Sequence, residues 1–126
     1  MGKKYLLDSN AVIDTLSANY PEEGLAFIKE VIDEEINVSA ITKMEVLGYE
    51  GDDSAYDKKR ELFISNSNVL PINDVVIDKA IELRKRHIKS LPDAVIAATA
   101  LVHHLTPITR NTKDFSNIKH LRIIDP

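Results

Sequence analysis

The chain has 126 residues, of which 44% are hydrophobic and 29% charged, as in an ordinary soluble globular protein, so we expect a single domain over residues 1–126. It contains no cysteine, which excludes disulfide bonds, thiolate metal sites and a cysteine nucleophile. The formal net charge of −4 argues against nucleic-acid binding by bulk electrostatics, but it does not exclude a nuclease, because a metal-dependent active site concentrates carboxylates.

The N-terminal segment predicts a short buried strand that leads into a helix. Three bulky residues, Tyr5, Leu6 and Leu7, precede Asp8, and this apolar stretch is too short for a signal peptide. No run in the chain approaches the ~20 apolar residues that span a bilayer, so we expect a cytoplasmic protein that does not contact a membrane. Asp8 lies where the strand ends and the helix begins. In that position it can face a cleft, or it can cap the helix.

The remaining segments alternate between helix and strand patterns. We expect helices over residues 9–17, from Pro21 past Ile32, and over residues 41–49, 58–65, 73–89 and 91–104. We expect strands over residues 5–7, 36–40, 68–72, 106–109 and 121–125. Residues 50–57 are the most polar segment and predict a surface loop. The helix that begins at Leu91 is apolar on all sides, which is typical of a buried helix. The alternation predicts an α/β domain with a mainly parallel sheet of about five strands, covered by helices on both faces.

Four acids lie where the carboxyl ends of such strands would meet. Asp8 follows the first strand, Glu45 lies in the helix after the second, Asp93 is in the first turn of the buried helix, and Asp114 follows the strand ending at Thr109. Ligands of parallel sheets bind beyond the carboxyl ends of the strands. Carboxylates in one pocket repel each other unless a cation binds between them. Oxygen ligands without nearby Cys or His favour Mg²⁺ or Mn²⁺.

Each acid also has a plain structural interpretation. Aspartate is a favoured N-cap, an isolated glutamate is most often a solvated helix residue, and an acid in a first turn complements the helix dipole. Asp114 could open a turn or cap a short helix before Phe115. Asp93 is the hardest to explain in this way, because it lies between Pro92 and a wholly apolar helix. Their expected convergence favours the functional interpretation.

The acids lie in four stretches with distinctive sequences. These are residues 7–10 (L-D-S-N), 42–45 (T-K-M-E), 91–100 (L-P-D-A-V-I-A-A-T-A) and 109–115 (T-R-N-T-K-D-F). In order and spacing they resemble the PIN-domain ribonucleases, and most of all the VapC-type toxins of toxin–antitoxin pairs. The resemblance covers essentially the whole chain and implies a PIN-like three-layer α/β/α sandwich. It also implies an Mg²⁺- or Mn²⁺-dependent endoribonuclease, a homodimer, and a cognate antitoxin whose peptide covers the active-site groove.

The resemblance also implies roles for individual acids. Asp8, Glu45 and Asp93 match the three principal acids that hold the metal and are catalytic in the family. Asp114 matches a fourth acidic position. Some relatives carry Asp at the position of Asn111, which could still orient a water or the substrate here but adds no charge. The number of metals, one or two, therefore stays open at this point.

Small hydroxyl groups and basic residues complete the predicted site. Ser9 and Thr109 match hydroxyl positions that help to hold the metal ligands in place. RNA is an anion, so an acidic pocket needs basic residues near its rim, and Lys43, Arg110 and Lys113 are the nearest in the sequence. The strongest basic cluster, residues 84–89, is explained equally well as a solvated helix face, a dimer surface or an RNA-binding surface.

Other classes of protein fit the acidic pattern less well. A receiver-type phosphoacceptor domain would need an adjacent pair of acids after the first strand, and positions 7 and 9 are Leu and Ser. A haloacid-type phosphatase would need an Asp two residues after Asp8, where Asn10 stands. A PIN-like binding module without catalysis remains an alternative, although the presence of all three principal acids argues against it.

Overall fold

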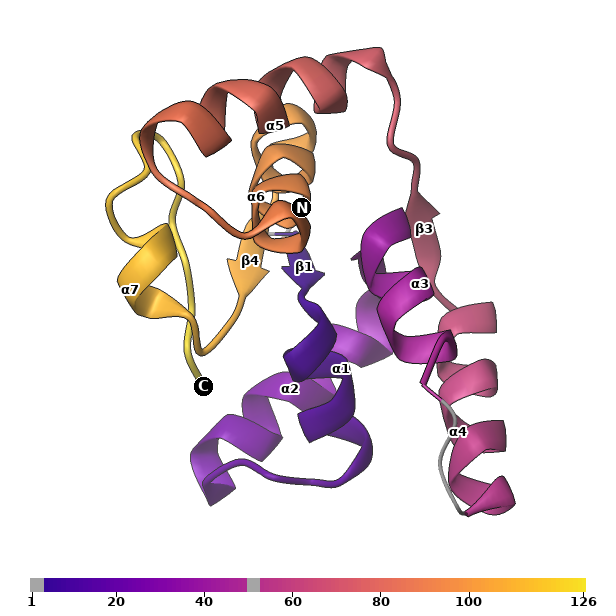
Figure 1. Cartoon of the computed structure of the whole chain (residues 1–126). Helices are drawn as coiled ribbons and strands as arrows, with labels where there is room; N and C mark the ends of the chain where they lie inside the picture. Colours follow the sequence, from indigo (N-terminus) through magenta and orange to yellow (C-terminus); the bar gives the residue numbers. More distant parts are fainter. Residues whose placement is uncertain (1–3, 50–52) are drawn as a thin grey trace.

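Four short parallel strands form one sheet in the computed structural model, which describes residues 4–49 and 53–126. The order is β3–β2–β1–β4, where the strands are β1 (Tyr5–Leu7), β2 (Asn37–Ser39), β3 (Asn68–Leu70) and β4 (Thr106–Ile108). The first strand is therefore central, between β2 and β4, and β1 and β4 point the same way in Figure 1. The chain segments that follow these three strands leave the sheet at the same edge.

Helices connect the strands and cover both faces of the sheet, as predicted (Figure 1). They are α1 (Ser9–Leu16), α2 (Glu22–Glu34), α3 (Ala40–Leu47), α4 (Ser54–Ser65), α5 (Asp74–Arg86), α6 (Leu91–His103) and the single-turn α7 (Thr112–Phe115). None of the helices in the described parts of the chain combines the length and apolar character that a bilayer crossing requires.

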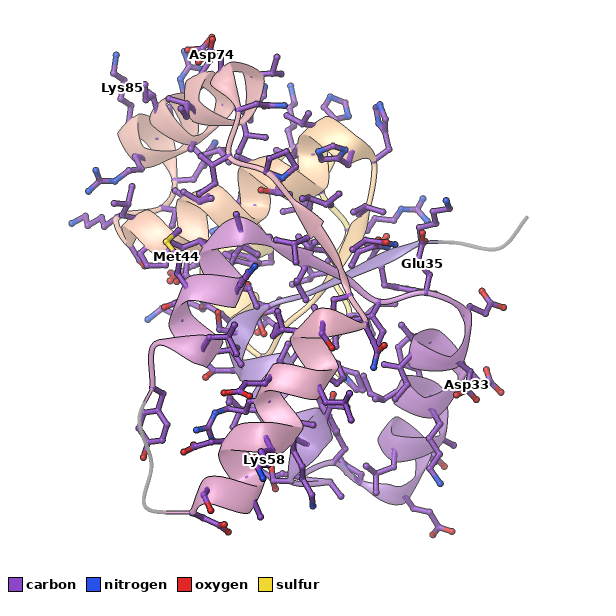
Figure 2. The ribbon with its side chains drawn as sticks, turned by 90° about the vertical axis from the view of Figure 1, so that its right-hand side faces the viewer. Asp33, Glu35, Met44, Lys58, Asp74 and Lys85 are labelled. Atoms are coloured by element: carbon purple, nitrogen blue, oxygen red, sulfur yellow. The ribbon has the colours of Figure 1, made fainter. Side chains whose placement is uncertain are left out.

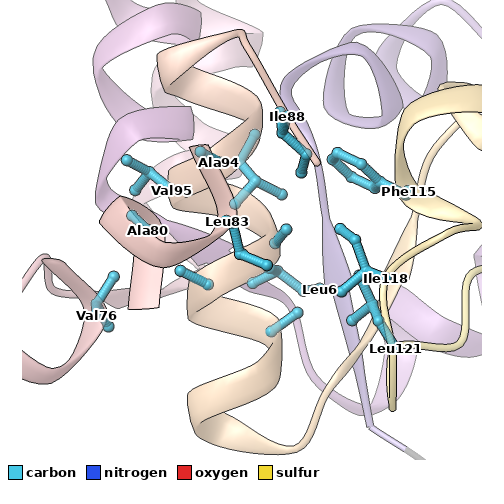
Figure 3. Packing of buried hydrophobic residues seen from close by; sticks show 14 of the residues in the cluster. Leu6, Val76, Ala80, Leu83, Ile88, Ala94, Val95, Phe115, Ile118 and Leu121 are labelled. Atoms are coloured by element: carbon cyan, nitrogen blue, oxygen red, sulfur yellow. The ribbon is translucent and has the colours of Figure 1, made fainter. Parts of the chain in front are cut away.

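Successive residues of the central strand point to opposite faces of the sheet, and each face has its own core. Leu6 packs in a cluster with the apolar sides of α5, α6 and α7 (Figure 3), whereas Leu7 packs with those of α1, α2, α3 and α4. Both leucines have no exposed surface. In α6, residues 94–100 are all buried, as the apolar sequence predicts. The three-layer α/β/α sandwich is thereby confirmed.

Polar residues at the strand–helix junctions start the helices. The side chains of Asp8, Ser39, Asn73 and Ser90 each accept a hydrogen bond from a backbone N–H in the first turn of α1, α3, α5 and α6, respectively. At Asp8 the bond is short, 2.7 Å from Ala11 N to Oδ1. The capping interpretation of Asp8 is therefore correct. It does not exclude a second role for the same carboxylate.

Two predicted segments are corrected by the structure. Residues 121–125 do not form a fifth strand: Ile124 makes one isolated parallel bridge with Ile108, and Leu121 packs into the core instead. The predicted loop over residues 50–57 is helical from Ser54, because the exposed Asp53 side chain caps α4 by accepting from two backbone N–H groups. Residues 50–52 of that prediction lie outside the described residues.

Candidate active site

Four carboxylates reach one edge of the sheet from four separate segments. Asp8 lies directly after β1, Glu45 is on α3, Asp93 is in the first turn of α6, and Asp114 is on α7. Their negative charges act on each other: the charge of Asp93 raises the pKa of Asp8, and the charges of Asp114 and Glu45 raise the pKa of Asp93. The structure thus brings together the four acids that the sequence singled out, because the strand order makes β1 the neighbour of both β2 and β4.

Asp8 is the most buried of these acids, with 6% of its surface exposed. Burial raises the pKa of the Asp8 carboxyl above its ordinary value, and the negative charges of Asp93 and Asp14 raise it further. Hydrogen bonds from the Thr109 side chain and the Ala11 N–H act in the opposite direction and favour the charged form. The hydroxyl of Thr109, itself 1% exposed, also accepts a bond of 2.9 Å from Asn111 N. Thr109 therefore links Asp8 to the turn after β4.

A serine hydroxyl holds the glutamate of the site. Ser9 Oγ donates to Glu45 Oε1 at 2.6 Å and lies 3.4 Å from Thr42 Oγ1. Ser9 follows Asp8 directly, so one dipeptide at the start of α1 supplies an acid and the group that orients another acid. Glu45 is otherwise exposed, in keeping with a side chain that can turn toward a ligand.

An asparagine connects the other two acids. Asn111 Nδ2 donates to Asp93 Oδ2 at 3.0 Å and to Asp114 Oδ2 at 3.2 Å. Burial raises the pKa of the Asp93 carboxyl, the charges of Asp114 and Glu45 raise it further, and hydrogen bonds to Ser90 and Asn111 lower it. The pKa shifts of Asp8 and Asp93 therefore have the same two causes, burial and neighbouring negative charge.

The residue types at this edge fit a hard divalent cation. All four acids supply oxygen ligands, and a cation would relieve the repulsion that raises the pKa of Asp8 and Asp93. Within the described residues, no group of three acid or histidine side chains is placed so that it could hold a metal ion. Ser9 and Asn111 hold the outer carboxylates by hydrogen bonds, and Glu45 and Asp114 are both exposed.

The basic residues predicted for the rim differ in what they contact. Lys43 on α3 and Lys113 on α7 are exposed. Arg110, in contrast, has a structural position: its Nε lies 3.5 Å from Asp14 Oδ2, its guanidinium lies 5.1 Å from the centre of the Tyr20 ring, and it donates to the Asn19 carbonyl. It ties the turn after β4 to the connection between α1 and α2.

We expect the Arg110→Ala variant to lose stability. An exposed ion pair contributes up to about 1 kcal/mol and a cation–π contact about 0.5–1 kcal/mol, so the free energy of unfolding should fall by about 1–2 kcal/mol. The Arg110→Lys variant should recover only part of this loss, because lysine lacks the planar fork. Urea denaturation measures both, with Arg122→Ala as the control at another exposed arginine. Equal losses for Arg110→Ala and Arg122→Ala would contradict a structural role for Arg110.

The basic cluster at residues 84–89 lies at the end of α5 that leads into α6. Its side chains are exposed except for the buried Ile88, and Lys85 projects from the outer surface of α5 (Figure 2). Arg84 donates to the Lys89 carbonyl at 3.3 Å and so closes the C-terminal end of α5. The cluster is therefore exposed at the C-terminal end of α5, close in sequence to Asp93, and this exposure is compatible with each of the three explanations.

Three further residues act on the site without having been predicted. Ser90 caps α6 and accepts from Asp93 N at 3.4 Å, Thr42 lies beside Ser9, and Asp14 acts on Asp8 through its charge. The Ser-Leu-Pro-Asp order is typical of a helix start and could have indicated Ser90. Nothing in the sequence indicates Asp14, because its spacing from Asp8 matches many unrelated helix residues.

The fold and the acidic edge define the class of protein: a small three-layer α/β domain with carboxylates gathered at the carboxyl edge of a parallel sheet. The family model described as PIN domain matches residues 5–121. The chain belongs to the PIN-domain family. Among curated protein sequences, no significant match was found.

Solved structures agree with this assignment. A toxin–antitoxin complex from Klebsiella pneumoniae contains a chain that is 31% identical with a TM-score of 0.76, and the match covers 98% of each chain. DNA-bound VapBC from Salmonella typhimurium matches with 26% identity and a TM-score of 0.76 over 98% of each chain. VapBC-1 from nontypeable Haemophilus influenzae matches with 26% identity and a TM-score of 0.70 over 96% of each chain. The predicted resemblance to VapC-type toxins is confirmed by these matches.

Proposed function

We propose that this PIN-domain protein is a metal-dependent endoribonuclease and the toxin of a type II toxin–antitoxin pair. The observation that carries the proposal is the convergence of Asp8, Glu45, Asp93 and Asp114 at the edge of the sheet, with burial and mutual repulsion raising the pKa of Asp8 and Asp93. Bringing these carboxylates together costs folding free energy, and a bound cation would offset that cost. The whole of residues 1–126 forms the nuclease domain in this proposal.

The residues of the site have different roles in the proposed hydrolysis of RNA. Asp8, Glu45, Asp93 and Asp114 would hold Mg²⁺ or Mn²⁺, which supplies a water of lowered pKa and neutralises charge on the scissile phosphate. Ser9 orients Glu45, and Thr109 and Asn111 orient Asp8 and Asp93 through the hydrogen bonds given above. Lys43 would attract the RNA backbone to this acidic edge.

Positive charge around the site has two sources in this proposal. Lys113, exposed on α7, would join Lys43 as a contact for phosphate groups. Arg110 acts on the substrate only indirectly, because its guanidinium is engaged with Asp14, Tyr20 and Asn19. Cleavage specificity would then depend on the shape of the edge and on lysine contacts with unpaired RNA.

The relatives support the proposal of a protein partner. The solved structures of 26–31% identity are toxin–antitoxin or VapBC assemblies, so we propose a cognate antitoxin whose peptide covers the acidic edge. We also propose a homodimer, and the cytoplasm as the compartment where the protein meets RNA. Co-purification with the product of a neighbouring short reading frame, followed by loss of cleavage in the complex, would test the antitoxin directly.

Cleavage of RNA by the purified chain is the deciding experiment. We expect single-stranded RNA to be cut with Mn²⁺ or Mg²⁺ and to stay intact with a chelator, because the carboxylates alone repel the phosphate backbone. Expression in cells should arrest growth, and sequencing of the cleaved RNAs would identify the substrate. The proposal fails if the purified chain cuts no RNA with either metal and the triple variant Asp8→Ala, Glu45→Ala, Asp93→Ala has the same effect on cell growth as the wild-type chain. A folded chain that binds RNA without cutting it would instead be a binding module.

A further inference from the structure

A cavity of about 300 Å³ lies where α6 ends and β4 begins. Thr106, the first residue of β4, lines this cavity, whereas Thr109 follows the other end of the strand, at the acidic edge. Asp93 and His104 lie at opposite ends of α6, about 16 Å apart along the helix axis at a rise of about 1.5 Å per residue. The cavity is therefore separate from the proposed nuclease site.

The polar side chains that line the cavity can all donate hydrogen bonds to an anion. They belong to His104, Thr106, His120 and Arg122, and the described residues contribute no carboxylate to the lining. An imidazole and a hydroxyl each have a donor, and the guanidinium of Arg122 has five donors and a permanent positive charge. Across residues 4–49 and 53–126, none of these four side chains has a hydrogen-bond or ion-pair partner. Their donors are therefore available to a ligand.

Both histidines of the cavity have a backbone conformation that favours glycine. The φ angle is 56° at His104 and 66° at His120, in the left-handed region that L side chains rarely adopt. His104 ends α6, and its backbone N–H bonds to the carbonyls of Ala100 and Leu101, at a place where helices usually carry glycine. The fold alone does not account for an imidazole at either position. Such backbone conformations cluster at functional sites.

The surroundings of the cavity are positive on a chain whose net charge is −4. Lys119 directly precedes His120, and the side chains of Lys119, His120 and Arg122 are exposed. Local positive charge attracts anions whatever the sign of the total. The carbonyl groups at the end of a helix repel anions, but those of Ala100 and Leu101 already accept hydrogen bonds from the cap. The lining therefore favours an anion with several acceptor oxygens.

We propose that this cavity binds a phosphate group, with Arg122, His104 and His120 as its principal donors. Guanidinium groups suit phosphate because their planar fork matches two of its oxygens, and each such bond is strengthened by charge. The Thr106 hydroxyl adds a further donor at the start of β4. A free nucleotide and the end of an RNA strand both carry such a group. The inference goes beyond the proposed function, because it involves neither the four acids nor a cation.

The test follows the amide and imidazole signals of the full chain by nuclear magnetic resonance, with a chelator present and at constant ionic strength. We expect inorganic phosphate to shift the signals of the cavity residues in a saturable way, and chloride to have no such effect. Arg122→Ala should weaken phosphate binding by at least about tenfold, because a hydrogen bond to a charged partner contributes that much. Lys58→Ala removes the same charge from an exposed position on α4 and should bind phosphate as the wild type does.

Replacement of His104 or His120 by glycine separates ligand binding from a structural role. Glycine suits the left-handed backbone at both positions, so each variant should keep or raise the melting temperature while phosphate binding weakens. A lower melting temperature together with an unchanged phosphate affinity would show that the imidazoles serve the fold, and it would overturn the inference.

Three further probes identify the source of the phosphate group: adenosine monophosphate and one short RNA with and without a terminal phosphate. Cavity signals that shift at a lower concentration of the phosphorylated RNA than of the nucleotide would support a strand end, and the reverse order a free nucleotide. Shifts confined to other surfaces with every probe would overturn the inference, as would binding of Zn²⁺ by the imidazoles without any response to phosphate. None of these measurements needs catalysis, so failure of the proposed nuclease function would leave the inference standing.

Discussion

Replacement of Asp8 by asparagine is expected to abolish metal-dependent RNA cleavage while leaving the fold intact. Asparagine caps helices about as well as aspartate, so the bond from Ala11 N survives, whereas the charge that binds a cation is lost. The rate should fall by more than about 100-fold, since changes to groups that merely support a metal ligand already cost 10–100-fold. Cleavage rates and circular dichroism of the purified variant measure the two effects separately.

The structure offers a matched control for this substitution. Asp53 caps α4 in the same way, accepting from the N–H groups of Ala55 and Tyr56, but its side chain is exposed and outside the acidic edge. Asp53→Asn should therefore leave cleavage unchanged. If Asp8→Asn lowers only stability, and the folded molecules cleave at the wild-type rate, Asp8 is a helix cap and nothing more.

Alanine substitutions at the other three acids are expected to reduce cleavage to different extents. Glu45→Ala and Asp93→Ala are expected to abolish cleavage as well, because each removes a carboxylate of the principal three. Asp114→Ala should be milder, since Asp114 is exposed and matches the fourth acidic position rather than one of the principal three. An equal loss for Asp114→Ala would show that Asp114 contributes as much to cleavage as the three principal acids.

Mn²⁺ should raise the melting temperature of the wild-type chain strongly at neutral pH. A ligand at 100 times its dissociation constant stabilises the folded state by about 2.7 kcal/mol, which corresponds to roughly 10 °C for a domain of this size. The shift should shrink as the pH falls toward 4, because the cation binds the deprotonated carboxylates. Thermal unfolding at several pH values, with Mn²⁺ and with a chelator, measures it.

The metal-free chain should show the opposite pH dependence. The folded-state pKa of Asp8 and of Asp93 is raised above the ordinary value of 3.8, so the stability that these groups contribute is fully present below that value. It is lost as the pH rises through the raised pKa, because folding then buries a charge. The Asp8→Asn variant removes part of this cost, so it should melt higher than the metal-free wild type at pH 7 and respond little to Mn²⁺. An equal Mn²⁺ shift in the variant would place the bound metal elsewhere.

Much of the fold was predictable because its signals are local. The caps at Asp8 and Asn73 lie next to apolar runs of helical or strand length, and such patterns need only a few neighbouring residues to be recognised. The all-apolar helix α6 indicated a buried position against a sheet. The prediction of a fifth strand was wrong. Residues 121–125 have a strand-like composition, but they pair with β4 at a single bridge, between Ile124 and Ile108.

The sequence by itself determined the alternation of strands and helices, the three-layer class, and which acids were candidates for a site. Only the tertiary structure decided what those residues contact. Arg110 was predicted as a contact for RNA, but it binds Asp14 and a carbonyl 91 residues away in the sequence. Asn111 was predicted to orient a water or the substrate, and its amide donates to Asp93 and Asp114. Such contacts join residues distant in the chain, and their energies depend on burial and on neighbouring charge, which no local pattern specifies.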